Sequence, residues 1–426
     1  MATGTTTRDD TKPPLALIAL ALIPFAFGYF LSYLFRAVNA VVAPDLVKEL
    51  GLSASELGLL TSAYLFAFAL FQLPLGILLD RYGARRVQAA LVFVAAMGAG
   101  LFAIGESVEV LTFARALIGL GFAGGLMAGF KAVVVWVPAP RRALANSLVM
   151  SAGAIGLLVA TAPTEWAVAQ FGWRDVILAL AALSVASAAL ILFGVPERSG
   201  SGTDTAPLGT QLRELGQIMR DRVFLALVPL LALTAGTQIA IQTLWAGPWL
   251  RDVAGLDRAG VADMLALAAI AFLAGVLLSG ALADLLQRRG VSLLTTMMGF
   301  LVVFFASQVA IVLNITDYSV ITWLAFGMSG QVAVLAYPWL SQHFGAHLAG
   351  RSNAGINAIM FGCAFGVQYL IGTIIDLYPT PADGRYDPAA YQMAFGVFFG
   401  LQIAALLWYV INWRTLRNAE RAFGSR

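Results

Sequence analysis

Long apolar runs separated by short polar connections follow one another along almost the whole chain. A helix that spans a bilayer needs about 20 predominantly apolar residues, and twelve runs come close to that length or exceed it. The first six lie near 15–43, 55–79, 87–105, 109–137, 144–169 and 174–195. The second six lie near 223–250, 260–284, 291–313, 318–340, 351–376 and 391–413. Helices satisfy their own backbone hydrogen bonds in lipid, so the pattern predicts an all-α integral membrane protein with twelve transmembrane helices.

One short pattern occurs twice, once in each half of the chain. The first copy reads GILLDRYGARR over 76–86, and the second reads GALADLLQRRG over 280–290. Each copy follows a long apolar run and contains an aspartate and a pair of arginines. A motif repeated at about half the chain length predicts a duplicated domain, and hence two pseudo-symmetric six-helix bundles.

The runs and connections divide the chain into five segments. We expect a cytoplasmic tail, a first bundle, a cytoplasmic linker, a second bundle and a second tail, over 1–14, 15–195, 196–222, 223–413 and 414–426. Within the linker, SGSGTDTAPLGT is flexible by composition, while QLRELGQIMRDR predicts a short amphipathic helix on the membrane surface.

Composition and charge agree with a membrane protein and orient it. The chain is 60% hydrophobic and 12% charged, where a soluble domain carries roughly 25% charged residues. Eighteen Lys and Arg lie on the tails and even-numbered connections, against five on the opposite face. The positive-inside bias therefore places both termini in the cytoplasm, which indicates the inner membrane. The high pI follows from this asymmetry and does not indicate nucleic-acid binding. Cys363 is the single cysteine, which excludes an intrachain disulfide.

The motifs resemble those of the major facilitator superfamily, and the resemblance covers nearly the whole chain. The first copy is similar to the family signature Gly-x-x-x-Asp-Arg-x-Gly-x-Arg-Arg at Gly76, Asp80, Arg81, Gly83, Arg85 and Arg86. FARALIGLG, which contains Arg115, resembles the fourth-span motif, and GWR over 172–174 is frequent in the fifth connection. The resemblance implies secondary transport by a two-bundle fold.

The same signature residues predict a latch at the cytoplasmic surface. Gly76 lets two helices approach closely, and Asp80 lies at a helix end with arginines one, five and six residues further on. Charge-assisted hydrogen bonds there can join the two bundles, and breaking them lets the bundles rock. The second copy offers Asp284 and Arg288 for the same role. The alternative interpretation is that the arginines only set the topology.

Arg36 is the leading candidate for substrate contact. Tyr29, Ser32, Tyr33, Arg36 and Asn39 fall on one polar stripe of an otherwise apolar helix. Charges inside spans are expensive and usually functional, and a guanidinium offers planar, bidentate donors to an anion. Alternatively, Arg36 snorkels to the outer interface or forms a structural pair.

Three further candidates are charged residues within the expected spans. Lys131 adds positive potential to an inward-facing cavity, or it snorkels to the inner surface. Arg115 is about 160° away from Lys131 around a straight helix, so we assign it a structural or coupling role. Glu165, near the outer end of the fifth run, is a partner for a cation, a proton carrier or an interfacial residue.

The second half offers uncharged hydrogen-bonding groups instead. Gln238 and Gln242 share a stripe of the seventh run, while Asn353 and Asn357 lie one turn apart in the eleventh. We therefore expect charge recognition from the first half and shape and hydrogen bonding from the second. Polar residues also hold helices together, which is the alternative for each of the four.

The first run resembles anion-handling branches of the superfamily, namely anion:cation symporters, organophosphate antiporters and cyanate/nitrate-type transporters. Their first-span arginine maps to Arg36. Organophosphate antiporters carry a second arginine in the seventh span, where this chain has glutamines, and this departure favours a monoanion such as a carboxylate over a doubly charged phosphate ester. The fifth run has Gly153 and Gly156 but lacks the Gly-Pro pair of drug antiporters.

These features predict a secondary transporter that moves a small, carboxylate-like anion by alternating access, coupled to a proton or a counter-anion. An exporter of amphipathic compounds is the alternative, and a non-transporting sensor on the same fold is a further one. No P-loop or nucleophile–base pair indicates an ATPase or an enzyme. We expect a monomer with no cofactor. His343 and His347 lack the glutamate of HExxH, so we expect surface histidines rather than a metal site.

Overall fold

The computed structural model describes residues 15–138, 141–196, 208–345, 347–379 and 384–422. All regular secondary structure within these ranges is helical. The expected tail over 1–14 lies outside the described residues, as do the first part of the linker and the last four residues of the chain.

The first half forms helices α1 to α7, and a short π-helical segment, η2, follows α7. Their bounds are α1 Leu15–Leu50, α2 Ala54–Ile104, α3 Val108–Phe122, α4 Gly125–Trp136, α5 Arg142–Val159, α6 Ala162–Phe171, α7 Trp173–Ala189 and η2 Leu190–Gly194. The linker contributes α8 (Leu208–Arg220), three residues earlier than the expected amphipathic helix.

The second half forms α9 to α17 with two irregular helical segments, η3 and η4. Their bounds are α9 Arg222–Ala240, η3 Ile241–Trp245, α10 Ala246–Asp252, α11 Arg258–Arg288, α12 Leu293–Val312, α13 Ser319–Ser329, η4 Gly330–Leu335, α14 Ala336–Phe344, α15 Ala349–Ile375, α16 Pro388–Ile411 and α17 Trp413–Arg421.

The described residues contain nine helices long and apolar enough to cross a membrane, or ten when the bent pair α5 and α6 counts as one span. Two of the expected runs fall within α2, which is 51 residues long. The expected tenth run is divided among α13, η4 and α14. The helical membrane fold is confirmed, whereas the count of twelve spans remains a prediction.

Glycines mark the breaks and the closest approaches between helices. Gly83 divides α2 with φ of 80°, a left-handed value that side chains with a Cβ rarely adopt. A Cβ built on Gly119 would lie 2.1 Å from the Tyr64 carbonyl oxygen, and one on Gly156 would lie 2.1 Å from that of Phe30. In lipid the hydrophobic effect does not drive helices together, and close contacts at small residues such as these two glycines hold the helices together instead.

The close approach expected at Gly76 is not present in this structure. Gly76 is exposed, and a Cβ built on it would meet no atom within 4 Å. The expectation from the signature glycine is therefore wrong for this conformation, because Gly76 lies on the exposed side of α2 while α4 contacts its neighbours Leu79 and Asp80.

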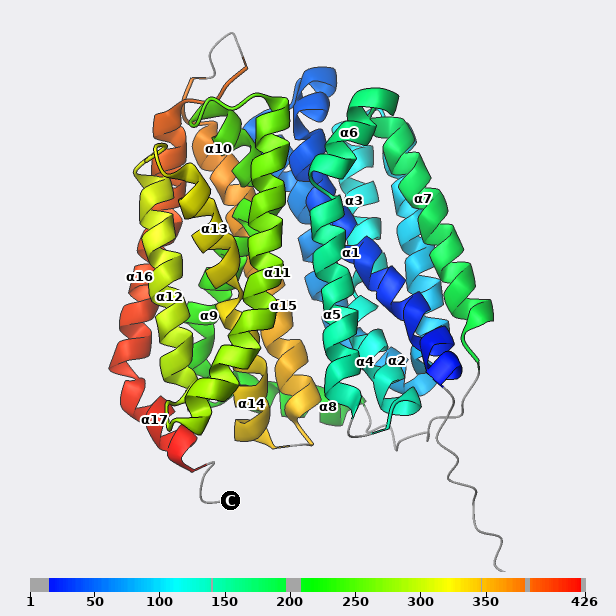
Figure 1. The fold of residues 1–426 in the computed structure, drawn as a ribbon, viewed down its shortest axis with the longest axis vertical. Coiled ribbons are helices and arrows are strands. Elements are labelled where there is room, and N and C mark those ends of the chain that lie inside the picture. Colours follow the sequence, from blue (N-terminus) through cyan, green and yellow to red (C-terminus); the bar gives the residue numbers. More distant parts are fainter. Residues whose placement is uncertain (1–14, 139–140, 197–207, 346, 380–383, 423–426) are drawn as a thin grey trace, which may run out of the picture.

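The two halves of the sequence lie side by side, with the helices of the first half to the right and those of the second half to the left in Figure 1. The linker helix α8 lies at the lower end, where it packs on α15 through an ion pair between Glu214 and Arg351 and through Met219 against Gly355. We call this end the α8 end. The opposite end carries α6, α10 and the first residues of α11, and we call it the Arg258 end.

Candidate substrate cavity

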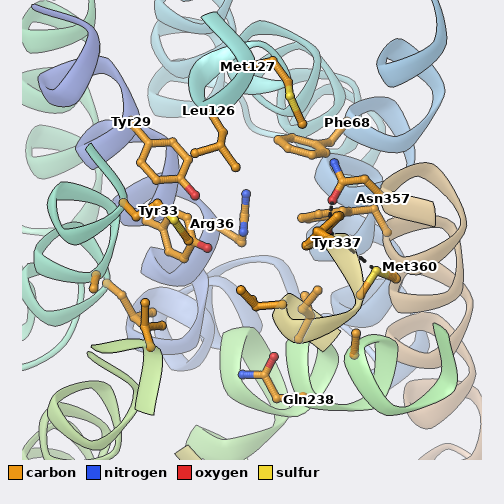
Figure 2. Close-up of a pocket in the computed structure, with 18 of the residues that line it drawn as sticks. Tyr29, Tyr33, Arg36, Phe68, Leu126, Met127, Gln238, Tyr337, Asn357 and Met360 are labelled. Atoms are coloured by element: carbon orange, nitrogen blue, oxygen red, sulfur yellow. Dashed lines mark hydrogen bonds between the residues drawn. The ribbon is translucent and has the colours of Figure 1, made fainter. Parts of the chain in front are cut away.

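A cavity of about 370 Å³ lies between the two halves, within the 300–1,000 Å³ typical of small-molecule sites. Its lining comes from α1, α2, α4, α5 and the end of α3 in the first half, and from α9, η3, α11, η4, α14 and α15 in the second. Most of the lining side chains are apolar, and Figure 2 shows Leu126, Met127 and Phe68 among them. The cavity extends from Arg36 to Gly350, which is at the α8 end.

Arg36 carries the only charge among the lining residues that the structure describes. Its side chain is 7% exposed, and it forms no ion pair with a described residue. Three rings surround the guanidinium carbon, with centroid distances of 4.3 Å to Tyr33, 4.8 Å to Phe361 and 5.2 Å to Phe68. The rings favour a cation electrostatically, yet the buried Nε has no hydrogen-bond partner. A buried cation in this setting is suited to binding an anion.

The polar stripe of α1 divides into two groups. Tyr29, Tyr33 and Arg36 line the cavity, and Figure 2 shows both hydroxyls on the same side as the guanidinium. Ser32 instead contacts the Tyr64 hydroxyl at 3.3 Å, and Asn39 donates to Thr61 Oγ1 at 3.0 Å. Ser32 and Asn39 are turned about 60–80° from Tyr29 around the helix, which directs them at α2. Asn39 is therefore placed between helices and does not line the cavity.

The expected polar residues of the second half line the cavity, but they also bond to one another or to nearby groups. Gln238 Nε2 donates to Gln242 Oε1. The Tyr337 hydroxyl donates to Asn357 Oδ1 at 3.0 Å, as Figure 2 shows. Asn353 Nδ2 donates to Ser341 Oγ at 3.1 Å. All four of the predicted amides thus reach the cavity, with much of their hydrogen-bonding capacity already used.

Phe68 and Phe361, two of the three rings around Arg36, are functional candidates that the sequence did not single out. Phe68 and Phe361 come from different halves, and their centroids are 4.2 Å apart. Gln72 also lines the cavity and donates to the Ala123 carbonyl at 3.1 Å. Phenylalanines within long apolar runs look alike in sequence, so no signal distinguishes a cavity position from a lipid-facing one.

Lys131 is placed outside the cavity lining. Its Nζ lies 2.7 Å from the Asp80 carboxylate and 2.6 Å from the Leu79 carbonyl oxygen. Both of its partners are on α2, so Lys131 joins α4 to α2 within the first half. This placement argues against the expected contact with substrate.

The predicted latch residues make contacts within the first half. Asp80 pairs with Lys131, and Arg85 Nε donates to the Leu192 carbonyl at 2.8 Å. Arg81 is exposed, with its guanidinium carbon 5.4 Å from the Tyr82 ring centroid. In the second copy, Asp284 and Arg288 are exposed, and neither forms an ion pair with a described residue. A latch between the halves remains a prediction for another conformation.

Arg115 occupies a buried position between α1, α2 and α3. It is 1% exposed, and its Nη1 donates to the Phe35 carbonyl at 2.8 Å. Its guanidinium carbon lies 5.2 Å from the Tyr64 ring centroid. The residue is absent from the cavity lining, and its contacts agree with the structural role expected for it.

Charged contacts join the two halves at the Arg258 end. Arg258 of α11 lies 2.7 Å from Asp45 of α1 and also pairs with Glu165 of α6. The Asp376 carboxylate accepts hydrogen bonds from the backbone N–H groups of Ala54 and Ser55 at 2.9 and 2.8 Å. These contacts join the two halves at the end opposite the α8 end.

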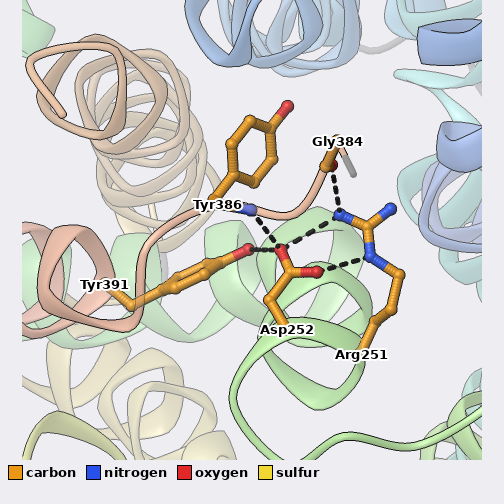
Figure 3. Close-up of polar contacts among 5 residues, drawn as sticks. All are labelled: Arg251, Asp252, Gly384, Tyr386 and Tyr391. Carbon is orange, nitrogen blue, oxygen red and sulfur yellow. Dashed lines mark hydrogen bonds and ion pairs between the residues drawn. The ribbon is translucent and has the colours of Figure 1, made fainter. Parts of the chain in front are cut away.

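A second polar cluster at the Arg258 end lies within the second half (Figure 3). The Asp252 side chain is fully buried, and it pairs with Arg251 at 2.5 Å. It also accepts hydrogen bonds from the Tyr391 hydroxyl at 2.7 Å and the Tyr386 N–H at 3.2 Å. Burial raises the pKa of Tyr386 to about 12. The cluster fastens the segment before α16 to α10.

The two histidines have ordinary surroundings. His343 Nε2 lies 3.1 Å from Asp221, the residue that caps α9, and its ring stacks on Trp339. His347 is exposed. No group of three His, Cys, Asp or Glu able to hold a metal ion occurs among the described residues.

Known proteins resemble this chain over most of its length. Residues 25–369 match the Major Facilitator Superfamily. The chain is 24% identical over 381 residues to the probable sulfoacetate transporter SauU of Cupriavidus necator, with 84% of this chain and 86% of that protein covered. It is 23% identical over 419 residues to the probable galactarate/D-glucarate transporter GudP of Bacillus subtilis, with 89% and 88% covered.

The fold is also similar to that of solved transporters. A bacterial homologue of the human lysosomal transporter Spinster, in an inward-facing and unoccupied conformation, superimposes with a TM-score of 0.73. The identity is 16%, and the match covers 96% of this chain and 99% of that one. Family, fold and named relatives agree on a multi-pass membrane transporter rather than an enzyme. The chain belongs to the major facilitator superfamily.

Proposed function

We propose that the protein is a secondary active transporter of small organic anions in the cytoplasmic membrane. The observation that carries the proposal is Arg36, a buried cation on a cavity between the halves without a carboxylate partner among the described residues. Leaving such a charge uncompensated is costly, and an anionic substrate would neutralise it. Relatives named for sulfoacetate and for galactarate or glucarate, all of them acids, support the same conclusion.

The proposed transport cycle is alternating access around Arg36. The halves are joined at the Arg258 end through Arg258, Asp45 and Glu165, while the cavity extends toward the α8 end. By the positive-inside bias the α8 end is cytoplasmic, so this conformation corresponds to the inward-facing state. Opening the other end requires Arg258 to leave both carboxylates, and rocking of the halves would then expose Arg36 to the outside.

The apolar lining favours one other function, the export of amphipathic compounds. Lipophilic cations would gain nothing from Arg36 and would be repelled by it. The two functions therefore differ in the sign of charge that binds.

The test is thermal unfolding of the purified protein with small anions, neutral solutes and lipophilic cations. A ligand at about 100 times its dissociation constant stabilises the folded state by about 2.7 kcal/mol. We expect stabilisation by anions, lost in Arg36→Gln and partly kept in Arg36→Lys. Stabilisation by cations that is the same in Arg36→Gln would establish the exporter and reject the proposal.

A further inference from the structure

We propose that the substrate is a monoanion with an apolar, preferably aromatic, body, and not a polyhydroxylated sugar acid. This inference rests on the proposed function and specifies its substrate class. It is an aryl or alicyclic carboxylate or sulfonate, with its acid group on Arg36 and its ring against the apolar side chains of both halves.

The charge of the cavity matches a single acid group. Arg36 is the only charged lining residue that the structure describes. Lys131 and Arg115, the nearby cations of the first half, are held by the Asp80 carboxylate and the Phe35 carbonyl oxygen and do not line the cavity. A second carboxylate would therefore enter a largely apolar space without a counter-charge, which costs several kcal/mol.

Hydrogen bonds within the protein already occupy part of the polar groups that line the cavity. Gln238 is bonded to Gln242, Tyr337 to Asn357, and Asn353 to Ser341. Gln72 and Thr243 donate to backbone carbonyls. A site that selects a hydroxylated substrate presents unpaired donors and acceptors to each hydroxyl. Here one end of each of these amides already has a partner, so a sugar acid that needs both ends would have to break these bonds.

The unpaired buried atoms on the cavity are few. They are Arg36 Nε, Gln242 Nε2 and Asn353 Oδ1. The Tyr29 and Tyr33 hydroxyls also line the cavity, on the same side as the guanidinium, where they can bond the acid group. The several hydroxyls of a hexuronate or an aldarate would meet a lining that is mostly apolar, where each polar group left without a partner is costly.

The surroundings of Arg36 are aromatic and extend into the apolar part of the lining. Tyr33, Phe68 and Phe361 surround the guanidinium, and the Phe272 ring centroid lies 6.3 Å from that of Tyr33. Aromatic pairs at such spacings contribute about 0.5–1.5 kcal/mol of stabilisation beyond that from burying their surface. Met127 and Met360 line the same space, as Figure 2 shows, and flexible thioethers adapt to flat rings.

The test uses the purified full-length chain and ligands matched in charge. Thermal unfolding midpoints are measured with phenylacetate, cyclohexanecarboxylate, galacturonate, glucarate and the neutral phenylacetamide, each at the same concentration. We expect phenylacetate and cyclohexanecarboxylate to raise the midpoint, and galacturonate, glucarate and phenylacetamide to leave it unchanged. Arg36→Gln should abolish the response to both ring acids.

A variant of the cavity lining sharpens the result. Met127→Gln keeps the length of the side chain and makes the lining more polar, so we expect it to weaken phenylacetate binding about fivefold or more. Met219→Gln makes the same change on α8, outside the cavity, and should bind phenylacetate like the unaltered protein. The unliganded midpoint of each variant shows whether it folds, and the ligand series on the unaltered protein decides the question without either variant.

The outcomes separate the two proposals. Stabilisation by galacturonate or glucarate that depends on Arg36 and exceeds that by the ring acids overturns the inference and leaves the proposed function standing. Stabilisation by phenylacetamide equal to that by phenylacetate, unchanged in Arg36→Gln, overturns both. A series in which no anion stabilises the protein also counts against both.

Discussion

Arg36 and Arg258 are two arginines in the same molecule with opposite surroundings. Arg258 lies at one end of the boundary between the halves and pairs with two carboxylates, Asp45 and Glu165. Arg36 lies on the central cavity, is buried, and has aromatic rings where Arg258 has carboxylates. A paired arginine holds two elements together, whereas a buried unpaired one is ready for an anion. The difference separates the closure of the transporter from its binding site.

Removing the charge of Arg36 has the largest expected effect. Truncating one partner of a buried charge pair costs about 2–5 kcal/mol, so Arg36→Gln should weaken anion binding by at least about 30-fold. Arg36→Lys keeps the charge but loses the planar, bidentate donors of the guanidinium. Its anion affinity should therefore lie between those of the unaltered protein and Arg36→Gln. Isothermal titration with a stabilising anion measures both. Unchanged affinity in Arg36→Gln would remove Arg36 from the site.

Removing Arg258 should instead shift the conformation. Its side chain is 43% exposed, so solvent screening limits the two ion pairs to about 1–2 kcal/mol, or roughly 5- to 30-fold in population. We expect Arg258→Gln to favour opening at the Arg258 end without removing the anion site. Spin labels at 48 and 263, in a Cys363→Ala background, report the distance between α1 and α11.

The matched control is Arg174→Gln, which breaks an ion pair with Glu49 inside the first half. It should leave the distance distribution between the labels unchanged. An unaltered distribution in Arg258→Gln as well would show that the ion pairs do not hold the Arg258 end closed.

Neutralising Glu165 should have a smaller effect of the same kind. Glu165→Gln leaves Arg258 paired with Asp45, so we expect a population shift of roughly fivefold or less in the same label experiment. If Glu165 is also the proton carrier, the variant loses the dependence of uptake on a pH gradient while anion exchange continues. Uptake by Glu165→Gln that still follows the pH gradient would exclude Glu165 as the carrier.

Lys131 provides the smallest expected effect and the sharpest contrast with Arg36. Its partners are Asp80 and the Leu79 carbonyl, and it does not line the cavity. Lys131→Gln should therefore change anion affinity by less than about twofold, since an exposed pair contributes only about 0–1 kcal/mol. A loss comparable to that of Arg36→Gln in titration would return Lys131 to the substrate site.

The sequence predicted the helical membrane fold and the position of Arg36 on a cavity, because apolar length and an isolated polar stripe have few alternatives in lipid. It also identified Gln238, Gln242, Asn353 and Asn357 as groups that reach the cavity. The prediction of these four amides depends on polar residues that recur at helical spacing within an apolar run.

Other features depend on which segments, far apart in the sequence, pack against each other in the fold. The sequence alone does not show this. Asn39 belongs to the same stripe as Arg36, but its side chain points toward α2, where it donates a hydrogen bond to Thr61. The sequence places Lys131 either at a cavity or at the inner surface and does not indicate its partner Asp80, which is 51 positions away. Gly76 matches a family signature whose close packing depends on the conformation, and here it is exposed.

The most direct test of the central claim is anion exchange in proteoliposomes, with the best stabilising anion loaded inside and its labelled form outside. The account predicts accumulation of label by the unaltered protein, and accumulation by Arg36→Gln no greater than in liposomes without protein. Equal exchange by Arg36→Gln would contradict it and make Arg36 a structural residue. Binding without exchange in the unaltered protein would instead indicate a sensor on this fold.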